Sequence, residues 1–202
     1  MKNLIKIRLV LRIVILISFS VLFIEANLNT DKNLKIDKKN SKVEVTGTSN
    51  LHNWETKVTK ADGELSVKVD ENNNITGYNS INVNFYSNSF SSGSSGMDTK
   101  TSDALKSEKF PVINFNSQQI SNVTVVNGKK QLHAKGKLTI DGISRQIDLN
   151  VLQTEVGTGV VCFEGKQEIK MTDYGIVPPV ALFGTVKAGD RVSIVFKVYF
   201  NY

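Results

Sequence analysis

Apolar and polar residues alternate along most of this chain. Near the C-terminus five apolar residues occupy every second position: Val192, Ile194, Phe196, Val198 and Phe200. They share one face of a β-strand, because successive strand side chains point to opposite faces. An antiparallel strand with one face in water has this pattern, whereas a central parallel strand is apolar on both faces. The pattern therefore predicts a strand that closes or borders an antiparallel sheet around an apolar interior.

Strand-like runs fill most of the preceding sequence. They cover residues 42–46, 54–59, 63–69, 75–88, 112–120, 131–140, 143–156 and 159–171. Asn-Gly at 127–128 and Asp-Gly at 141–142 supply the positive φ angles that tight hairpin turns require. Eight or nine strands joined by hairpins predict an all-β fold, either an up-and-down barrel or a sandwich.

One segment departs from this alternation. Residues 91–96 are all Ser or Gly, and Asp98 can cap a short helix that ends before Pro111. The apolar side of this helix would consist of Met97, Leu105 and Phe110. We expect the helix to plug the core of the barrel, with a lid over one mouth as the alternative.

The first 26 residues have the layout of a secretory signal peptide. Four basic residues precede the apolar run 13–24, namely Lys2, Lys6, Arg8 and Arg12, and the small residue Ala26 follows it. The apolar run is shorter than the ~20 residues that a membrane-spanning helix needs, and an uncleaved anchor is the alternative. We therefore expect a signal peptide at 1–26, a polar lead-in at 27–40 and one barrel domain at 41–202 in a periplasmic or secreted protein.

Charge and cysteine content narrow the classes of function. The net charge of +6 falls to +3 without residues 1–26, which carry four basic residues and Glu25. Nucleic-acid binding is therefore not indicated, while mild attraction to anionic lipid leaves contact with a membrane surface open. Cys162 is the only cysteine, so no intramolecular disulfide can form, and it is expected to pack as a small apolar residue.

Few residues suggest catalysis. A Gly-x-Ser-x-Gly elbow, a phosphate loop and a dinucleotide fingerprint are absent from the sequence. His52 and His133 have no second ligand at metal-binding spacing, so we expect neither a metal nor a cofactor. His133 falls on the polar side of its strand, whereas His52 precedes Trp54 at a corner between strands. We place His52 and Asp173, from a second such corner, at the mouth of a pocket.

Four segments follow one another in an order found in a known family. They are SKVEVTGTS with LHNW (41–54), the helix with FPVINF (97–115), GKLTIDGI (136–143), and TDYGI with GDRV (172–192). Through these segments the chain resembles the YceI-like family of exported, lipocalin-like proteins, also called polyisoprenoid-binding proteins. The resemblance implies an eight-stranded antiparallel barrel whose long apolar cavity binds isoprenoids, isoprenoid quinones or fatty-acid derivatives. It carries over no catalytic motif.

We therefore prefer a carrier that holds one apolar, chain-like molecule inside the barrel. The residues expected to line its cavity are Val43, Val45, Trp54, Val83, Phe85, Ile113, Phe115, Leu138, Leu149, Phe163, Phe196 and Val198. The ligand's identity and the oligomeric state stay open.

Two other hypotheses remain. The large aromatic residues of this set can instead fill the barrel, which would then be a structural or protein-interaction module of the cell envelope, with a stress-related role among the options. Its loops 91–111 and 172–190 would contact the partner. Alternatively, the protein is an enzyme acting on a lipophilic substrate, with His52 and Asp173 at the mouth.

Overall fold

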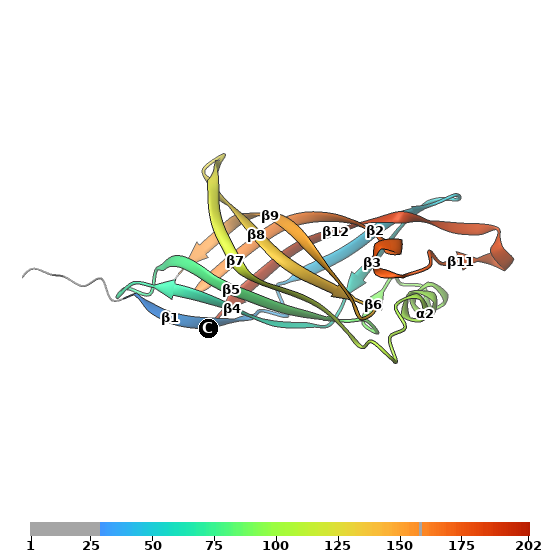
Figure 1. The fold of residues 1–202 in the computed structure, drawn as a ribbon, viewed down its shortest axis with the longest axis horizontal. Coiled ribbons are helices and arrows are strands. Elements are labelled where there is room, and N and C mark those ends of the chain that lie inside the picture. Colours follow the sequence, from blue (N-terminus) through green and yellow to red (C-terminus); the bar gives the residue numbers. More distant parts are fainter. Residues whose placement is uncertain (1–28, 158) are drawn as a thin grey trace, which may run out of the picture.

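Short turns join almost all the strands of this chain in the computed structural model, which describes residues 29–157 and 159–202. The strands are β1 (Thr30–Ile36), β2 (Lys42–Ser49), β3 (Asn53–Val58), β4 (Ala61–Val69), β5 (Ile75–Tyr86), β6 (Phe90–Ser91), β7 (Val112–Val126), β8 (Lys129–Ile140), β9 (Ile143–Gly157), β10 (Val160–Lys170), β11 (Val180–Ala181) and β12 (Val186–Asn201). One α-helix, α2 (Ser95–Ala104), and two 3-10 turns, η1 (Met171–Tyr174) and η2 (Leu182–Gly184), complete the described elements (Figure 1).

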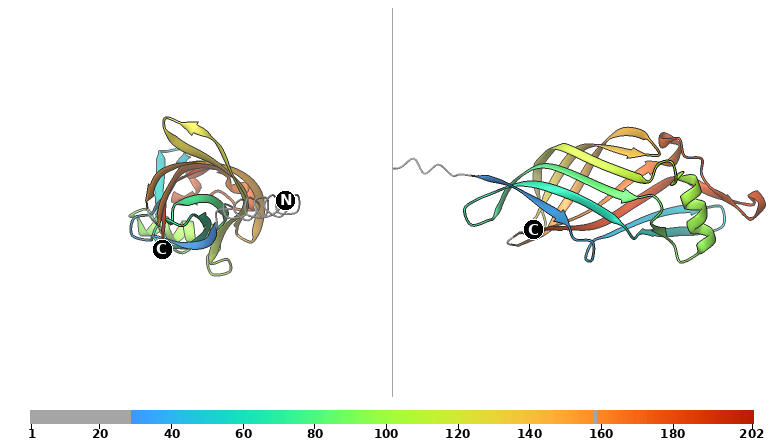
Figure 2. Two further views of the ribbon diagram at one scale, coloured as in Figure 1. Left: turned by 90° about the vertical axis from the view of Figure 1, so that its left-hand side faces the viewer. Right: turned by 90° about the horizontal axis from the view of Figure 1, so that it is seen from below.

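The strands close into a barrel. Their order is β1-β4-β5-β7-β8-β9-β10-β12, and β12 pairs back onto β1, all antiparallel. Further along its length β12 pairs with β2, which pairs with β3. β1 and β2 therefore follow one another along the same edge of β12 and together act as one strand of the barrel. In the same way β4 pairs with β1 and β3 pairs with β2, at the next strand position. The predicted eight-stranded up-and-down barrel is confirmed, and Figure 2 shows it end-on and from below.

The barrel strands begin earlier than residue 41. Within the expected polar lead-in, residues 30–36 form β1, in which Leu34 and Ile36 are buried. Leu34 lies opposite Leu65 of β4. Lys, Asp and Asn occupy the neighbouring positions of β1, so only two apolar residues indicate this strand in the sequence.

The predicted alternation of buried and exposed positions is confirmed where it is clearest. The inward positions of β8 are all buried, and these are Leu132, Ala134, Gly136, Leu138 and Ile140. Cys162 is fully buried in β10. The turns 127–128 and 141–142 have positive φ at both residues, as tight hairpins require.

Helix α2 begins earlier than expected and covers one end of the barrel (Figure 2). Its N-cap is Ser94, and Asp98 instead ties down the preceding loop by accepting hydrogen bonds from the Ser92 N–H (2.7 Å) and hydroxyl (2.6 Å). None of its residues is buried, which contradicts a helix that plugs the core. No helix within the described ranges is long and apolar enough to cross a membrane.

Candidate functional site: an apolar cavity in the barrel

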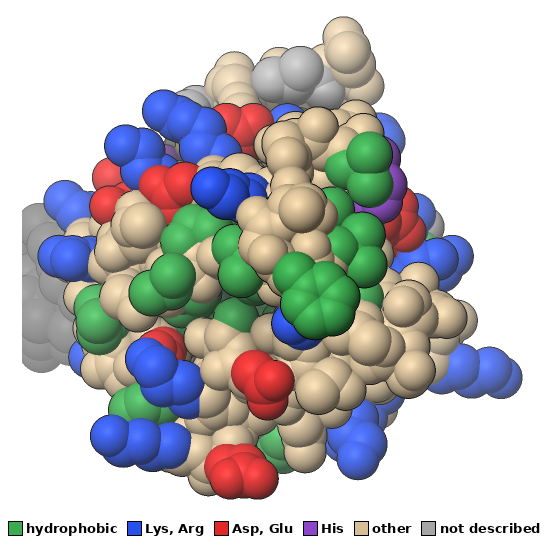
Figure 3. Space-filling model, turned by 90° about the vertical axis from the view of Figure 1, so that its right-hand side faces the viewer, with side chains coloured by type: hydrophobic (Ala, Val, Ile, Leu, Met, Phe, Trp, Pro, Cys, Tyr) green, Lys and Arg blue, Asp and Glu red, His purple; other side chains and the backbone are tan. Residues whose placement is uncertain are grey.

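A cavity of about 640 Å³ opens at the end of the barrel that α2 covers. Most of its wall comes from β2, β3, β12, α2 and the segment 176–186, and β5, β6, β7, β8 and β10 contribute further side chains. Figure 3 looks onto this end, where apolar side chains gather around a hollow. The described lining residues include no Asp or Glu. The cavity falls within the ~300–1,000 Å³ typical of small-molecule sites, which are mostly apolar.

A second cavity of about 120 Å³ lies deeper in the barrel. Aromatic rings close its inner end: Tyr78 meets Phe163 edge-on at 5.6 Å between ring centres, and Phe163 lies 6.2 Å from Phe200. The Tyr78 hydroxyl donates to Oε1 of Gln153 (2.7 Å). Burial raises the pKa of Tyr78, so its phenol stays neutral at physiological pH.

A constriction separates the two cavities. Four side chains line both of them, namely Val43, Phe85, Leu138 and Ile194. Val43 and Ile194 come from the neighbouring strands β2 and β12, while Phe85 and Leu138 come from β5 and β8 elsewhere around the barrel. The interior therefore consists of a wide outer chamber and a small inner one on a common path.

Glycines on the wall explain why the aromatic residues leave this space open. Three rings lie directly over glycines: Trp54 over Gly47, Phe115 over Gly136 and Phe196 over Gly165. A Cβ atom at these glycines would lie 2.2, 2.6 and 2.5 Å from the respective ring. Each ring thus occupies the volume of the missing glycine side chain and lies against the wall. This arrangement argues against a barrel filled by its aromatic side chains.

The corner between β2 and β3 forms part of the rim. The Trp54 indole N–H donates to the Thr48 carbonyl (2.9 Å), which fixes the ring in the wall. The Ser49 hydroxyl accepts hydrogen bonds from the Leu51 and His52 N–H groups (3.1 and 3.0 Å). Nδ1 of His52 lies 2.8 Å from the Asn53 carbonyl, and its exposed ring lines the mouth.

One polar side chain lies inside the outer chamber without a partner. Thr56 lies on the inward face of β3 between Trp54 and Val58, and it is 2% exposed. Its hydroxyl makes no hydrogen bond to any part of the protein that the structure describes. Because a buried polar group without a partner is costly, a polar atom of a ligand can bind here favourably.

The structure brings together the twelve residues predicted to line a cavity. The outer chamber has Val43, Val45, Trp54, Phe85, Ile113 and Leu138 in its wall, and the inner one adds Val83, Phe115, Leu149, Phe163, Phe196 and Val198. Whether they contact a ligand stays a prediction. The sequence analysis missed Thr56, although it lies two residues after Trp54 on the same strand face. It also missed Lys100 and Thr101 of α2, which no sequence periodicity indicates.

The two residues expected at the mouth do not meet. His52 lines the rim, whereas Asp173 in η1 is not among the described residues of either cavity wall. The Asp173 carbonyl instead accepts a hydrogen bond from Arg145 Nε (2.9 Å). A site built on His52 and Asp173 therefore has no support in this geometry.

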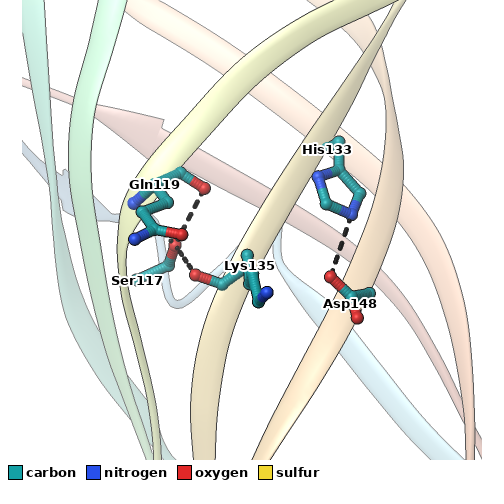
Figure 4. Close-up of polar contacts among 5 residues, drawn as sticks. All are labelled: Ser117, Gln119, His133, Lys135 and Asp148. Carbon is teal, nitrogen blue, oxygen red and sulfur yellow. Dashed lines mark hydrogen bonds and ion pairs between the residues drawn. The ribbon is translucent and has the colours of Figure 1, made fainter.

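His133 lies on the outer wall, away from His52. Its Nε2 is 3.2 Å from Asp148 Oδ1 on the neighbouring strand β9 (Figure 4). Beside it, the Ser117 hydroxyl donates to the Lys135 carbonyl (2.8 Å) and stabilises an irregularity in β7. Across residues 29–157 and 159–202, no group of three His, Cys, Asp or Glu side chains is placed to hold a metal ion.

Solved structures of other proteins share this fold. BcnA of Burkholderia cenocepacia has a TM-score of 0.64 at 20% identity, over 81% of this chain and 98% of that one. A polyisoprenoid binding domain from Saccharophagus degradans, implicated in plant cell wall breakdown, has a TM-score of 0.63 at 11% identity, over 83% and 97%. The Campylobacter jejuni YCEI protein has a TM-score of 0.59 at 16% identity, over 73% and 84%.

At these identities the likeness to solved structures concerns the fold. Among curated proteins, none matches the chain. A family profile described as the YceI-like domain matches residues 34–200, from the middle of β1 to the end of β12. The family profile covers nearly the whole closed eight-stranded barrel, and the chain therefore belongs to the YceI-like domain family.

Proposed function

We propose that this protein is a carrier that holds one apolar, chain-like molecule, an isoprenoid, an isoprenoid quinone or a fatty-acid derivative, in its barrel. The observation that carries the proposal is the apolar outer chamber of about 640 Å³. The name of the Saccharophagus degradans neighbour, a polyisoprenoid binding domain, points in the same direction. We assign the protein a binding role and no catalytic one.

The size of the chamber suits a ligand of moderate length. At ~30 Å³ for each non-hydrogen atom, the volume that a water molecule takes in the liquid, it holds about 20 such atoms. Removing roughly 500 Å² of apolar ligand surface from water contributes about 12 kcal/mol at ~25 cal/mol per Å². Association and ordering costs consume several kcal/mol of this, so micromolar or tighter binding is expected.

We also propose that the protein acts outside the cytoplasm. The basic residues before the apolar run 13–24, and the small residue after it, support a signal peptide at 1–26. These residues lie outside the described part of the structure. Mass spectrometry of the protein recovered from the periplasm or medium tests this, because a cleaved chain begins near Asn27.

Native mass spectrometry of the exported protein, purified without detergent, tests the carrier function. A stoichiometric adduct of isoprenoid or acyl mass, identified after organic extraction, is the expected result. A clean apo mass that resists loading with quinones and fatty acids would overturn the proposal and favour an interaction module.

A matched pair of variants links the adduct to the chamber. Val45 lines the outer chamber, and Thr46 is the next residue of β2, on the opposite face. Val45→Trp should project a bulky ring across the chamber and abolish the adduct of a chain-like ligand, while Thr46→Trp should keep it. Equal loading of the two variants would mean that the ligand binds elsewhere.

A further inference from the structure

Exposed apolar side chains are concentrated beside the mouth of the outer chamber. Five of them form a surface that we call the tip: Leu51, Val177, Val180, Leu182 and Phe183. Phe183 is as exposed as a side chain can be, and Leu182 and Leu51 are 66% and 65% exposed. In Figure 1 the segment from β11 to β12 extends beyond α2 at the right-hand end of the molecule. The part of the tip between β11 and β12 is therefore the outermost part of this end.

The backbone of the tip is held in a conformation that non-glycine residues rarely adopt. Leu182 and Phe183 have φ of 49° and 55°, in the left-handed region. The Thr185 hydroxyl and N–H both donate to the Leu182 carbonyl, at 2.7 and 3.2 Å. Such strain persists only where the surrounding structure imposes it, and it is common at functional sites. Here it directs two large apolar side chains into solvent.

Hydrogen bonds join the two segments of the tip into one unit. The Asn50 side chain donates to the Thr185 carbonyl (2.8 Å) and accepts from the Lys187 N–H (2.7 Å). The Asn50 N–H donates to the Lys187 carbonyl (3.1 Å). Leu51 is thereby fixed beside the segment that carries Leu182 and Phe183.

The tip is continuous with the cavity and has no acidic residue. Leu51, Val180 and Leu182 belong both to the exposed tip and to the lining of the outer chamber. The sequence has no Asp or Glu from Tyr174 to Gly189 or from Val45 to Trp54, and each stretch has a single basic or imidazole side chain, Lys187 and His52. The side chains shared by the tip and the chamber wall therefore connect the exposed apolar surface to the ligand chamber, and neither stretch carries a negative charge.

We propose that the tip inserts into the surface of a lipid bilayer and docks the mouth of the barrel there, so that the apolar ligand passes between bilayer and chamber without crossing water. This inference rests on the proposed carrier function and specifies where the ligand is exchanged. Large apolar side chains that project fully into solvent suit a fluid hydrocarbon interface. The two segments of the tip also carry no carboxylate that anionic lipid headgroups would repel.

Co-sedimentation of the whole protein with vesicles of phosphatidylcholine and phosphatidylglycerol tests docking. We expect Phe183→Ser to weaken vesicle binding about tenfold, and Phe183→Ser with Val177→Ser to weaken it further, since each buried apolar side chain adds about that factor. Val125→Ser is the matched control, because Val125 is 65% exposed on the β7–β8 hairpin and belongs to neither the tip nor the cavity walls. These positions are exposed, so all variants should fold.

Ligand transfer separates this inference from the carrier function. Phe183 and Val177 are not among the described residues that line either cavity. The double variant should therefore load a quinone from dilute solution as the unaltered protein does, but should take it up from vesicles at least tenfold more slowly. The proposal is overturned if the unaltered protein does not sediment with vesicles, or if Phe183→Ser and Val125→Ser behave alike. If no variant loads a quinone by either route while vesicle binding still depends on the tip, the carrier function fails and docking stands.

Discussion

The aromatic residues that face the lumen depend on their glycine neighbours. The ring of Trp54 occupies the space where a side chain at Gly47 would lie. A bulky ring on a strand normally projects into the interior and fills it. Over a glycine it can lie against the wall, which enlarges the chamber and keeps the ring as an apolar surface.

Gly47→Ala should therefore displace Trp54, because the new Cβ would lie 2.2 Å from the ring. We expect a change in tryptophan fluorescence, a loss of roughly 1–3 kcal/mol of stability from overpacking, and weaker ligand binding. Gly77→Ala is the control, since its Cβ would meet Lys68 at an ordinary 3.7 Å. Urea unfolding and fluorescence titration distinguish the two, and equal behaviour would contradict the role of Gly47.

Thr56 should increase the affinity of the chamber for ligands that carry a polar atom. Its hydroxyl is buried without a partner, so Thr56→Val removes an unsatisfied group while keeping the shape. Stability should stay unchanged or rise, whereas affinity for a quinone or fatty acid whose oxygen reaches this depth should fall by about 0.5–1.5 kcal/mol.

Calorimetric titration of Thr56→Val measures this difference. Thr46→Val, on the outer face of the neighbouring strand β2, is the matched control and should bind as the unaltered protein does. A hydrocarbon ligand of the same length should bind Thr56→Val and the unaltered protein with equal affinity. A difference in affinity for the hydrocarbon would mean that Thr56 contributes through packing instead.

Among the elements at the mouth, two carboxylates hold the loops in place. Asp98 accepts hydrogen bonds from Ser92, and Asp190 accepts them from the Thr172 N–H (2.9 Å) and hydroxyl (2.8 Å). The Ser92 hydrogen bonds hold the pKa of Asp98 below its ordinary value, and those of Thr172 do the same for the pKa of Asp190. The ionised carboxylates thus favour the ordered loops.

We expect the mouth to loosen in acid before the barrel unfolds. A carboxylate with a folded pKa below its unfolded value of about 3.9 stabilises the fold fully above that value, and this contribution is lost as pH falls through the folded pKa. After correction for the pH dependence of intrinsic amide exchange, protection from hydrogen exchange at residues 92–98 and 171–175 should therefore fall below about pH 4. Asp190→Asn should show faster exchange near Thr172 already at neutral pH. Protection that stays the same as the pH falls through this range would contradict this role.

Strand prediction succeeded where apolar residues recur at every second position, as in β8 and β12. It missed β1, because Leu34 and Ile36 alone mark its inward face. It placed the start of α2 at Asp98, since a carboxylate that ties down a preceding loop has the same local sequence as an N-cap. The inward and outward faces of the barrel strands can be predicted from the local spacing of apolar residues. The start of the helix at the mouth cannot, because it depends on tertiary contacts.

For the molecule as a whole, ligand binding should raise thermal stability. A ligand present at a hundred times its dissociation constant adds about 2.7 kcal/mol when it binds only the folded state. For a domain of this size, about 2–4 °C per kcal/mol gives an increase in Tm of roughly 5–11 °C. Differential scanning calorimetry with and without quinone measures it, and Val45→Trp should show no increase.

The site was predictable only in part at this scale. Period-two spacing identified the apolar wall, because every inward position of a closed barrel faces the same interior. Spacing along a strand does not show whether that interior is open. This depends on pairs such as Phe196 and Gly165, which are distant in sequence and opposite one another in the sheet.

The pairing of β12 also has a consequence for how the chain reaches this structure. β12 pairs with β10, β2 and β11. It also pairs with the first strand, β1, where Lys35 lies opposite Asn201 and Ile36 lies opposite Phe200. Until Val192–Asn201 is in place, β10 and β2 each present an unpaired edge, and such edges pair readily with other chains. Closure joins segments from opposite ends of the barrel sequence, so it should be slow. A newly made chain will thus pass through an open, aggregation-prone sheet, and its yield will depend on how quickly this last strand docks.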